Sequence, residues 1–134
     1  MEFNVVKHSK EEFYNVFNHW IENHDMPLDS IPMEMLPNNI FVCYNGELPI
    51  YALPFWFTDS KIGIASVMIS NVKINIKKRI GGKEFLINHI VQYAKNKKLK
   101  SIFSPTTNKK FIESLLNVGF LQGDEDSSQY FLKL

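Results

Sequence analysis

The sequence is poor in cysteine and has no long hydrophobic run. Its single cysteine, Cys43, excludes an intramolecular disulfide and a zinc site built on several cysteines. Cys43 lies in the apolar run of residues 40 to 44, where a small buried hydrophobe is expected rather than a nucleophile. No apolar stretch approaches the roughly 20 residues that span a bilayer. Residues 1 to 4 also lack the basic-then-apolar plan of a signal peptide, so we expect a soluble protein of a reducing cytoplasm.

An excess of charge of either sign is also missing. The net charge of +1 leaves no broad electrostatic footprint for nucleic acid or a membrane surface. No aromatic residues alternate with the lysines as they do on single-strand binding surfaces, so a nucleic-acid partner is disfavoured. The four histidines show no metal-ligand spacing, and the acidic run at residues 124 to 126 lacks the periodicity of a calcium loop. We therefore predict no metal site.

The composition is that of one globular domain. Hydrophobic residues make up 45% and charged residues 22% of the 134 positions, which argues against disorder. A chain of this length buries one core and is too short for two ordinary domains. We predict a single domain over residues 1 to 134.

The first half of the chain predicts a strand, a helix and an antiparallel meander. A short β-branched segment at residues 3 to 7 precedes Ser9 and Glu12, which form the pattern of a capping box. The following helix has apolar residues at helical spacing: Phe13, Val16, Phe17, Trp20 and Ile21. A proline-rich segment at residues 25 to 39 predicts a packed loop or a short second helix.

The meander is centred on the Asn45-Gly46 pair between apolar runs at residues 40 to 44 and 48 to 57, a strong hairpin signal. Pro49 and Pro54 cannot donate to a ladder, so a bulge or an edge is expected there. Residues 62 to 69 predict a third strand, which could resume at residues 72 to 76 beyond an interruption at residues 70 and 71.

The second half predicts a long helix, a strand, a further helix and two final strands. The long helix ends near Lys95, Lys97 and Lys98, and a strand follows at residues 101 to 103. Asn108 can cap the next helix, in which Phe111, Leu115 and Leu116 are expected to face inward, and Gly119 can close it with a positive φ. Residues 120 to 121 and 129 to 134 predict the last strands. The result is an α/β fold with a mixed central sheet, an antiparallel meander plus a parallel crossover, and flanking helices.

The start of the long helix conflicts with ordinary helix preferences. Cations flank two glycines there: Lys77, Lys78, Arg79, Gly81, Gly82 and Lys83. A helix start prefers carboxylates, and a helix interior disfavours glycine. One interpretation is an anion site, at which cations and bare amides converge on a phosphate. The other starts the helix at a cap formed by Asn75 and places both glycines inside it at about 1 kcal/mol each, where they permit close packing on the sheet.

The order of elements over essentially the whole chain resembles the GCN5-related N-acetyltransferase (GNAT) superfamily. In that family an Arg/Gln-x-x-Gly-x-Gly/Ala run binds the pyrophosphate of acetyl-coenzyme A through backbone amides at a helix start. The resemblance implies cofactor-binding residues at Lys78, Arg79, Ile80, Gly81, Gly82 and Lys83. In this register Gly81 matches the first glycine, but Lys78 replaces Arg/Gln and Lys83 replaces the second small residue. A shift by one places Gly82 in the second small position and Ile80 in the first.

A second family motif, Asn followed by a helix and Gly-Phe, matches Asn108 through Gly119-Phe120 and implies that Asn108 belongs to the cofactor site. The position that commonly holds a tyrosine general acid is Leu115, with Leu116 beside it. Residues 62 to 69 contain no carboxylate or histidine for the family's occasional general base. No catalytic residue is therefore assigned, although positioning an amine against a thioester can itself accelerate transfer.

The resemblance implies two functions. The first is an acyl-CoA-dependent N-acetyltransferase-like protein, with acetyl-CoA as cofactor and an unidentified amine acceptor, either a small molecule or a protein. Pantetheine would lie between residues 62 to 69 and residues 101 to 103. The alternative is a catalytically degenerate GNAT-fold protein with a structural, binding or phage-assembly role and a protein assembly partner. Lys83, the missing tyrosine and the Lys/Asn/Ile-rich composition are similar to small virus-encoded GNAT-like proteins, which would reside in the host cytoplasm or the virion.

Overall fold

The computed structural model describes residues 2–22, 33–124, 130 and 132. It contains one six-stranded sheet with the order β1-β2-β3-β4-β6, and β5 pairs with β3 off this path. The strands are β1 (Phe3–His8), β2 (Asn39–Asn45), β3 (Leu48–Phe57), β4 (Ile62–Ala65), β5 (Ile69–Ser70) and β6 (Ser101–Phe103). The helices are α1 (Lys10–Glu22), η2 (Met33–Met35), η3 (Ile76–Lys78), α2 (Gly82–Asn96) and α3 (Lys109–Val118).

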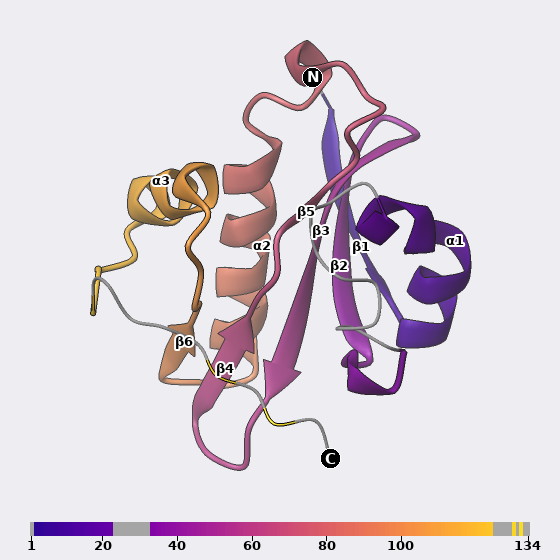
Figure 1. Cartoon of the computed structure of the whole chain (residues 1–134). Helices are drawn as coiled ribbons and strands as arrows, with labels where there is room; N and C mark the ends of the chain where they lie inside the picture. The colour runs from indigo at the N-terminus through magenta and orange to yellow at the C-terminus, as the bar shows by residue number, and fades with distance from the viewer. Residues whose placement is uncertain (1, 23–32, 125–129, 131, 133–134) are drawn as a thin grey trace.

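The sheet combines an antiparallel meander with a parallel crossover, as the sequence predicts. Strands β1 to β4 pair in chain order and antiparallel, whereas β4 and β6 are parallel. The connection from β4 to β6 carries α2. Figure 1 shows α1 on one face of the sheet and α2 with α3 on the other. No helix in the described ranges is long and apolar enough to cross a bilayer.

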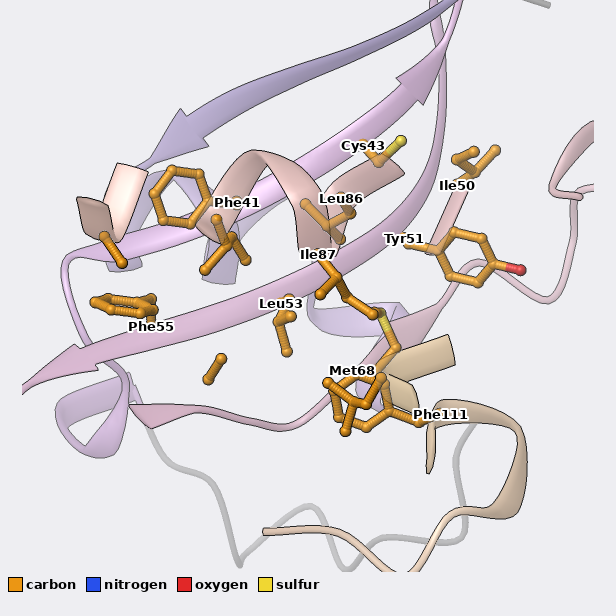
Figure 2. Packing of buried hydrophobic residues seen from close by; sticks show 14 residues of the cluster. Phe41, Cys43, Ile50, Tyr51, Leu53, Phe55, Met68, Leu86, Ile87 and Phe111 are labelled. Carbon is orange, nitrogen blue, oxygen red and sulfur yellow. The ribbon is translucent and has the colours of Figure 1, made fainter. Parts of the chain in front are cut away.

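Two buried clusters hold these layers together because residues alternate between the two faces of β2. Ile40 and Val42 pack with the α1 side chains Phe13, Phe17 and Trp20. Phe41 and Cys43 belong to the cluster under α2 and α3, which Figure 2 shows from close by. Cys43 is fully buried within it, as the apolar run around it predicts.

The β2–β3 hairpin and its irregularity are both confirmed. Gly46 has φ +61° in the turn. The register shifts between Cys43 and Tyr44, whose partners on β3 are Tyr51 and Pro49, so Ile50 is the extra residue of a bulge. The bulge places Ile50 and Tyr51, although adjacent in sequence, in the same buried cluster. This pair lies under the start of α2.

Helix α1 begins as predicted. The Ser9 amide donates to Glu12 Oε1 at 3.3 Å, and the Glu12 amide donates to Ser9 Oγ at 3.2 Å, which is a capping box. The predicted apolar stripe is wrong at Val16, which is 58% exposed, because the buried face is already filled by large aromatic side chains. The side chain of Ile21 lies outside the described part of the structure.

Helix α3 is also capped as predicted. Asn108 Oδ1 accepts the Phe111 amide at 2.9 Å, and Gly119 closes the helix with φ +114°. Phe111 and Leu115 are buried, but Leu116 is 46% exposed, so the expectation that Leu116 faces inward is wrong. A residue directly after a buried one lies about 100° around a helix, which carries Leu116 off the packed face.

Other predictions need correction. The third strand stops at Ala65, and only β5 continues the pairing with β3. The region of residues 72 to 76 is no strand, because Asn71 folds it into a turn: its carbonyl accepts the Ile74 amide at 3.1 Å and its Oδ1 accepts the Lys73 amide at 3.3 Å. Residues 120 and 121 are also irregular.

Two predicted segments fall mainly outside the described residues. Of the predicted last strand at residues 129 to 134, the structure describes only residues 130 and 132. Of the proline-rich segment, the described part contains the short 3-10 helix η2 followed by the buried Leu36.

Candidate functional site

The backbone before α2 is broken into two short turns. Asn75 Oδ1 accepts the Lys77 amide at 2.9 Å and caps η3, not α2. The chain then turns through Gly81, whose φ of +85° is left-handed, and α2 begins at Gly82. The prediction of a helix running from Asn75 through both glycines is therefore wrong. Gly81 supplies the left-handed turn between η3 and α2, a conformation that glycine adopts readily.

Three amides at the start of α2 remain without a partner in the described structure. The Gly82 amide donates to the Arg79 carbonyl at 3.0 Å, and the Phe85 amide donates to the Gly81 carbonyl at 3.1 Å. The amides of Gly81, Lys83 and Glu84 have no hydrogen-bond acceptor among the described residues. Such free donors at the positive end of a 15-residue helix favour an anion.

The second interpretation of the sequence also held that the glycines permit close packing of the helix on the sheet. This part is right for Gly82. A Cβ added to Gly82 would lie 2.7 Å from Ile50 Cδ1 and 3.1 Å from ring carbons of Tyr51. A side chain here would require Ile50, the Tyr51 ring or the helix start to shift. The two glycines thus have different roles: Gly81 makes the turn, and Gly82 lets the helix start approach the sheet.

Two cations converge on the ring of Tyr51 beside these amides. The guanidinium carbon of Arg79 lies 5.8 Å from the ring centroid, and Lys83 Nζ lies 5.4 Å from it, within the range of a cation–π contact. Arg79 is fixed by a 3.0 Å hydrogen bond from its Nε to the Ile74 carbonyl. Figure 2 shows the Tyr51 hydroxyl pointing away from Leu53 and Ile87.

Positive charge is in excess around Lys83 and Tyr51. Burial lowers the pKa of Lys83, and the like charges of Lys110 and Arg79 lower it further, against smaller opposing effects of Glu84 and Glu113. Burial also raises the pKa of Tyr51. Within the described ranges, none of these three cations takes part in an ion pair.

The other predicted site residues have no contact with the Tyr51 ring among the described interactions. Lys78 and Ile80 have exposed side chains, and the Lys78 carbonyl accepts Asn45 Nδ2 at 3.0 Å. Asn108 lies at the start of α3, where its side-chain oxygen is used as the helix cap. Sequence reasoning missed Tyr51 and Lys110. Two signals in the sequence indicate them. The prolines of β3 predict a bulge near Tyr51, and Lys110 is a cation in the first turn of a helix capped by Asn108.

The sheet opens between β5 and the segment after β6. Strands β4 and β6 pair through Ile64 and Phe103, and Ser66 Oγ donates to the Pro105 carbonyl at 3.1 Å. Beyond this point β5 pairs with β3, and no described strand pairs with its other edge. Strand β5 and the segment after β6 therefore separate on the side of the sheet where α2 and α3 begin.

A cavity of about 250 Å³ lies between β6, α3 and residues 120 to 124. Thr106 and Thr107, which directly precede Asn108, also line it, whereas no residue of β4 or β5 does. Leu115 and Leu116 line it as well, and neither can donate a proton. Among the described residues no group of three or more histidine, cysteine or carboxylate side chains could hold a metal ion.

Solved structures share this architecture. An aminoglycoside acetyltransferase from an uncultured soil metagenomic sample, in complex with sisomicin, superposes with a TM-score of 0.68 at 12% identity, covering 98% of this chain and 96% of that one. A ribosomal-protein-alanine N-acetyltransferase from Brucella melitensis superposes with a TM-score of 0.65 at 12% identity, covering 99% of both chains. This chain has the GNAT fold.

A third similar structure is a complex with a bisubstrate analogue. AAC(6')-Iy, in complex with the bisubstrate analogue CoA-S-monomethyl-acetylneamine, has a TM-score of 0.62 at 11% identity, covering 99% of this chain and 98% of that chain. No protein-family model and no curated protein matches the sequence. The GNAT fold is thus established by structural similarity, while sequence identity to these structures is low.

Proposed function

We propose that this protein binds acetyl-CoA and transfers its acetyl group to an amine. The observation that supports this most directly is the set of unpartnered amides at Gly81, Lys83 and Glu84, flanked by Arg79 and Lys83. Backbone donors and cations in this arrangement suit a pyrophosphate. These amides and cations lie within residues 79 to 84, and residues 78 to 83 resemble the pyrophosphate-binding motif of the GNAT family.

Each part of the loop has a separate role in this proposal. The turn at Gly81 begins α2 and leaves the amides of Gly81, Lys83 and Glu84 without acceptors among the described residues, and Gly82 lets the helix start lie close to the sheet. Arg79, fixed by the Ile74 carbonyl, supplies a positioned charge. Asn108 retains a side-chain NH₂ group, since only its oxygen is used in capping.

The opening between β5 and the segment after β6 is the proposed path of pantetheine. It would bring the thioester near Ser66 and Ser104, where the two halves of the sheet separate. The amine nitrogen would attack the thioester carbonyl from the α1 side and form the C–N bond of the amide. The C–S bond breaks to release the coenzyme A thiolate, and the amine loses one proton to solvent. We assign no side chain as proton donor, so the protein contributes chiefly by holding the two reactants in contact.

The acceptor is proposed to be an amine of either small-molecule or protein origin. Structures with this fold include acetyltransferases for aminoglycosides and for a ribosomal-protein alanine. An aminoglycoside and a peptide with an N-terminal alanine are therefore suitable first probes, and a polyamine extends the panel.

Thermal melting with acetyl-CoA tests the first step. A ligand at 100 times its dissociation constant stabilises the folded state by about 2.7 kcal/mol, so a clear rise in Tm is expected. Lys83→Ala is expected to reduce the rise, and tighter binding by this variant would instead mean that Lys83 obstructs the loop. Lys95→Ala, at the other end of α2, is the matched control. Absence of any shift at millimolar acetyl-CoA in the unaltered protein would overturn the proposal.

The alternative is a GNAT-fold protein without chemistry that serves in binding or assembly. The observation favouring it is that Leu115, at the position of the family's tyrosine, is buried against the core. Release of free coenzyme A thiol, followed with a thiol reagent in the presence of each amine, separates the two functions. Binding of acetyl-CoA without thiol release from the whole panel would favour the degenerate protein.

A further inference from the structure

The parallel ladder between β4 and β6 is short (Figure 1). It pairs Ile62 with Ser101 at one end and Ile64 with Phe103 at the other. The next two pairs keep the same offset of 39 residues along the chain, but serine hydroxyls join them. The two chain segments therefore change at this point from backbone pairing to pairing through side chains.

Each of the two chain segments contributes one hydroxyl. Ser104 Oγ donates to the Ala65 carbonyl. Ser66 Oγ donates to the Pro105 carbonyl at 3.1 Å. The Ser66 amide instead donates to the Pro54 carbonyl of β3 at 3.2 Å, and a proline has no amide hydrogen. These two hydroxyl-to-carbonyl bonds, which we call the serine latch, continue the pairing where these backbone donors are not available to it.

The serine latch borders the opening between β5 and the segment after β6. Ser66 lies between β4 and β5 in the chain, and Ser104 is the first residue after β6. Both residues are half-buried. A hydrogen bond between neutral groups contributes little net free energy, because it replaces bonds to water. A ligand with its own N–H donors can therefore compete for the two carbonyls.

We propose that the serine latch is closed in the free protein and opens to admit the pantetheine arm of coenzyme A. The inference rests on the proposed function, which places pantetheine in this opening. Pantetheine contains two secondary amides, and an amide N–H needs an acceptor when it leaves water. Opening the latch frees the carbonyls of Ala65 and Pro105 to accept these N–H groups. Ser66 and Ser104 are thus positioning residues, which set how readily the arm enters.

A closed latch lowers the affinity for any ligand that carries the arm. A ligand that binds only the open form has an apparent affinity reduced in proportion to the open fraction. Replacing either serine with alanine removes one of the two bonds that hold the closed form, so the open fraction rises. The variant should lose stability and gain affinity together, a combination that a merely structural hydrogen bond does not produce.

The test compares coenzyme A with ADP, which has the adenosine and diphosphate of coenzyme A but no pantetheine. Isothermal titration calorimetry on the full chain measures both affinities. Ser66→Ala and Ser104→Ala are expected to bind coenzyme A about threefold to tenfold more tightly than the unaltered protein, the range of one neutral hydrogen bond, with ADP affinity unchanged. Ser114→Ala is the matched control, because Ser114 Oγ also donates to a backbone carbonyl, that of Lys110 at 3.2 Å, but within α3.

The outcomes separate the serine latch from the proposed function. If coenzyme A binds and the ratio of its affinity to that of ADP is the same in all three variants, the latch falls and the proposed cofactor stands. A ratio lowered in Ser66→Ala or Ser104→Ala would also overturn the latch, because the serines would then hold the arm itself. If coenzyme A binds these two variants but not the unaltered protein, the latch stands and the proposed function falls. If it binds none of them, both fall.

Discussion

Gly82 lies directly over Ile50, and a Cβ on Gly82 would come within 2.7 Å of Ile50 Cδ1. The contact exists because the bulge of β3 presents both Ile50 and Tyr51 to α2. The same bulge supplies the aromatic ring that Arg79 and Lys83 approach. An irregularity in one strand thus fixes both the close helix start and the position of its cations.

Gly82→Ala is expected to destabilise the protein by about 1 kcal/mol. Overpacking a well-filled core costs about 1–3 kcal/mol, and the better helix propensity of alanine returns up to about 1 kcal/mol. Urea unfolding measures the difference. Gly123→Ala is the control, because a Cβ at Gly123 meets nothing within 4 Å. A Gly82→Ala variant as stable as the unaltered protein would mean that Ile50 yields without cost.

Local signals made most of the fold predictable. The capping box at Ser9 and Glu12, the turn at Gly46 and the cap at Asn108 each satisfy backbone groups through neighbours in sequence. Such interactions can be read from a short window of residues. The mixed sheet follows from them, because a long helix between two strands imposes a parallel crossover.

The remaining features depend on distant partners. The turn at Asn71 is tied to the Pro49 carbonyl, 2.9 Å from its Nδ2, and alternating apolar residues after it imitate a strand. Likewise, Lys110 joins the candidate site only because α3 packs on α2. The motif around Gly81 could be located from the sequence. The choice between a broken and a continuous helix could not, because glycine adopts both a helical and a left-handed conformation.

Cys43 is expected to resist alkylation in the folded protein. It is fully buried, and burial raises the pKa of its thiol to about 12, so almost no thiolate exists at neutral pH. Iodoacetamide at pH 8 should leave Cys43 unmodified, as measured by mass spectrometry, and should modify it completely in denaturant. Stoichiometric labelling of the native protein at the rate seen in denaturant would contradict its place in the core.

The ionisation of Glu12 should make the free energy of unfolding depend on pH in the acid range. Its pKa is lowered by hydrogen bonds from the Ser9 side chain and backbone and, to a smaller extent, by His8. A carboxylate with a depressed pKa in the folded state stabilises it above the unfolded pKa of about 4.3. This contribution is lost as the pH falls through the folded pKa.

The pH effect can be isolated with a neutral variant. The free energy of unfolding of the unaltered protein is expected to fall with decreasing pH below about 4.3 more steeply than that of Glu12→Gln, measured by urea titration at each pH. Glu11→Gln removes the same charge one residue earlier and controls for net charge. If the free energy of unfolding falls with pH in parallel for Glu12→Gln and the unaltered protein, the capping box is not the source of the pH dependence.

Asn108 offers a way to separate helix capping from ligand binding at one residue. Its Oδ1 caps α3 by accepting the Phe111 amide, so Asn108→Ala should lower the free energy of unfolding by about 1 kcal/mol. Asn108→Ser keeps a capping oxygen and should retain most of the stability, but it lacks the NH₂ group that we propose for cofactor binding. Acetyl-CoA affinity is therefore expected to fall in both variants while stability falls mainly in the alanine variant. Full affinity in Asn108→Ser would restrict Asn108 to its capping role, because only the amide nitrogen distinguishes the two side chains there.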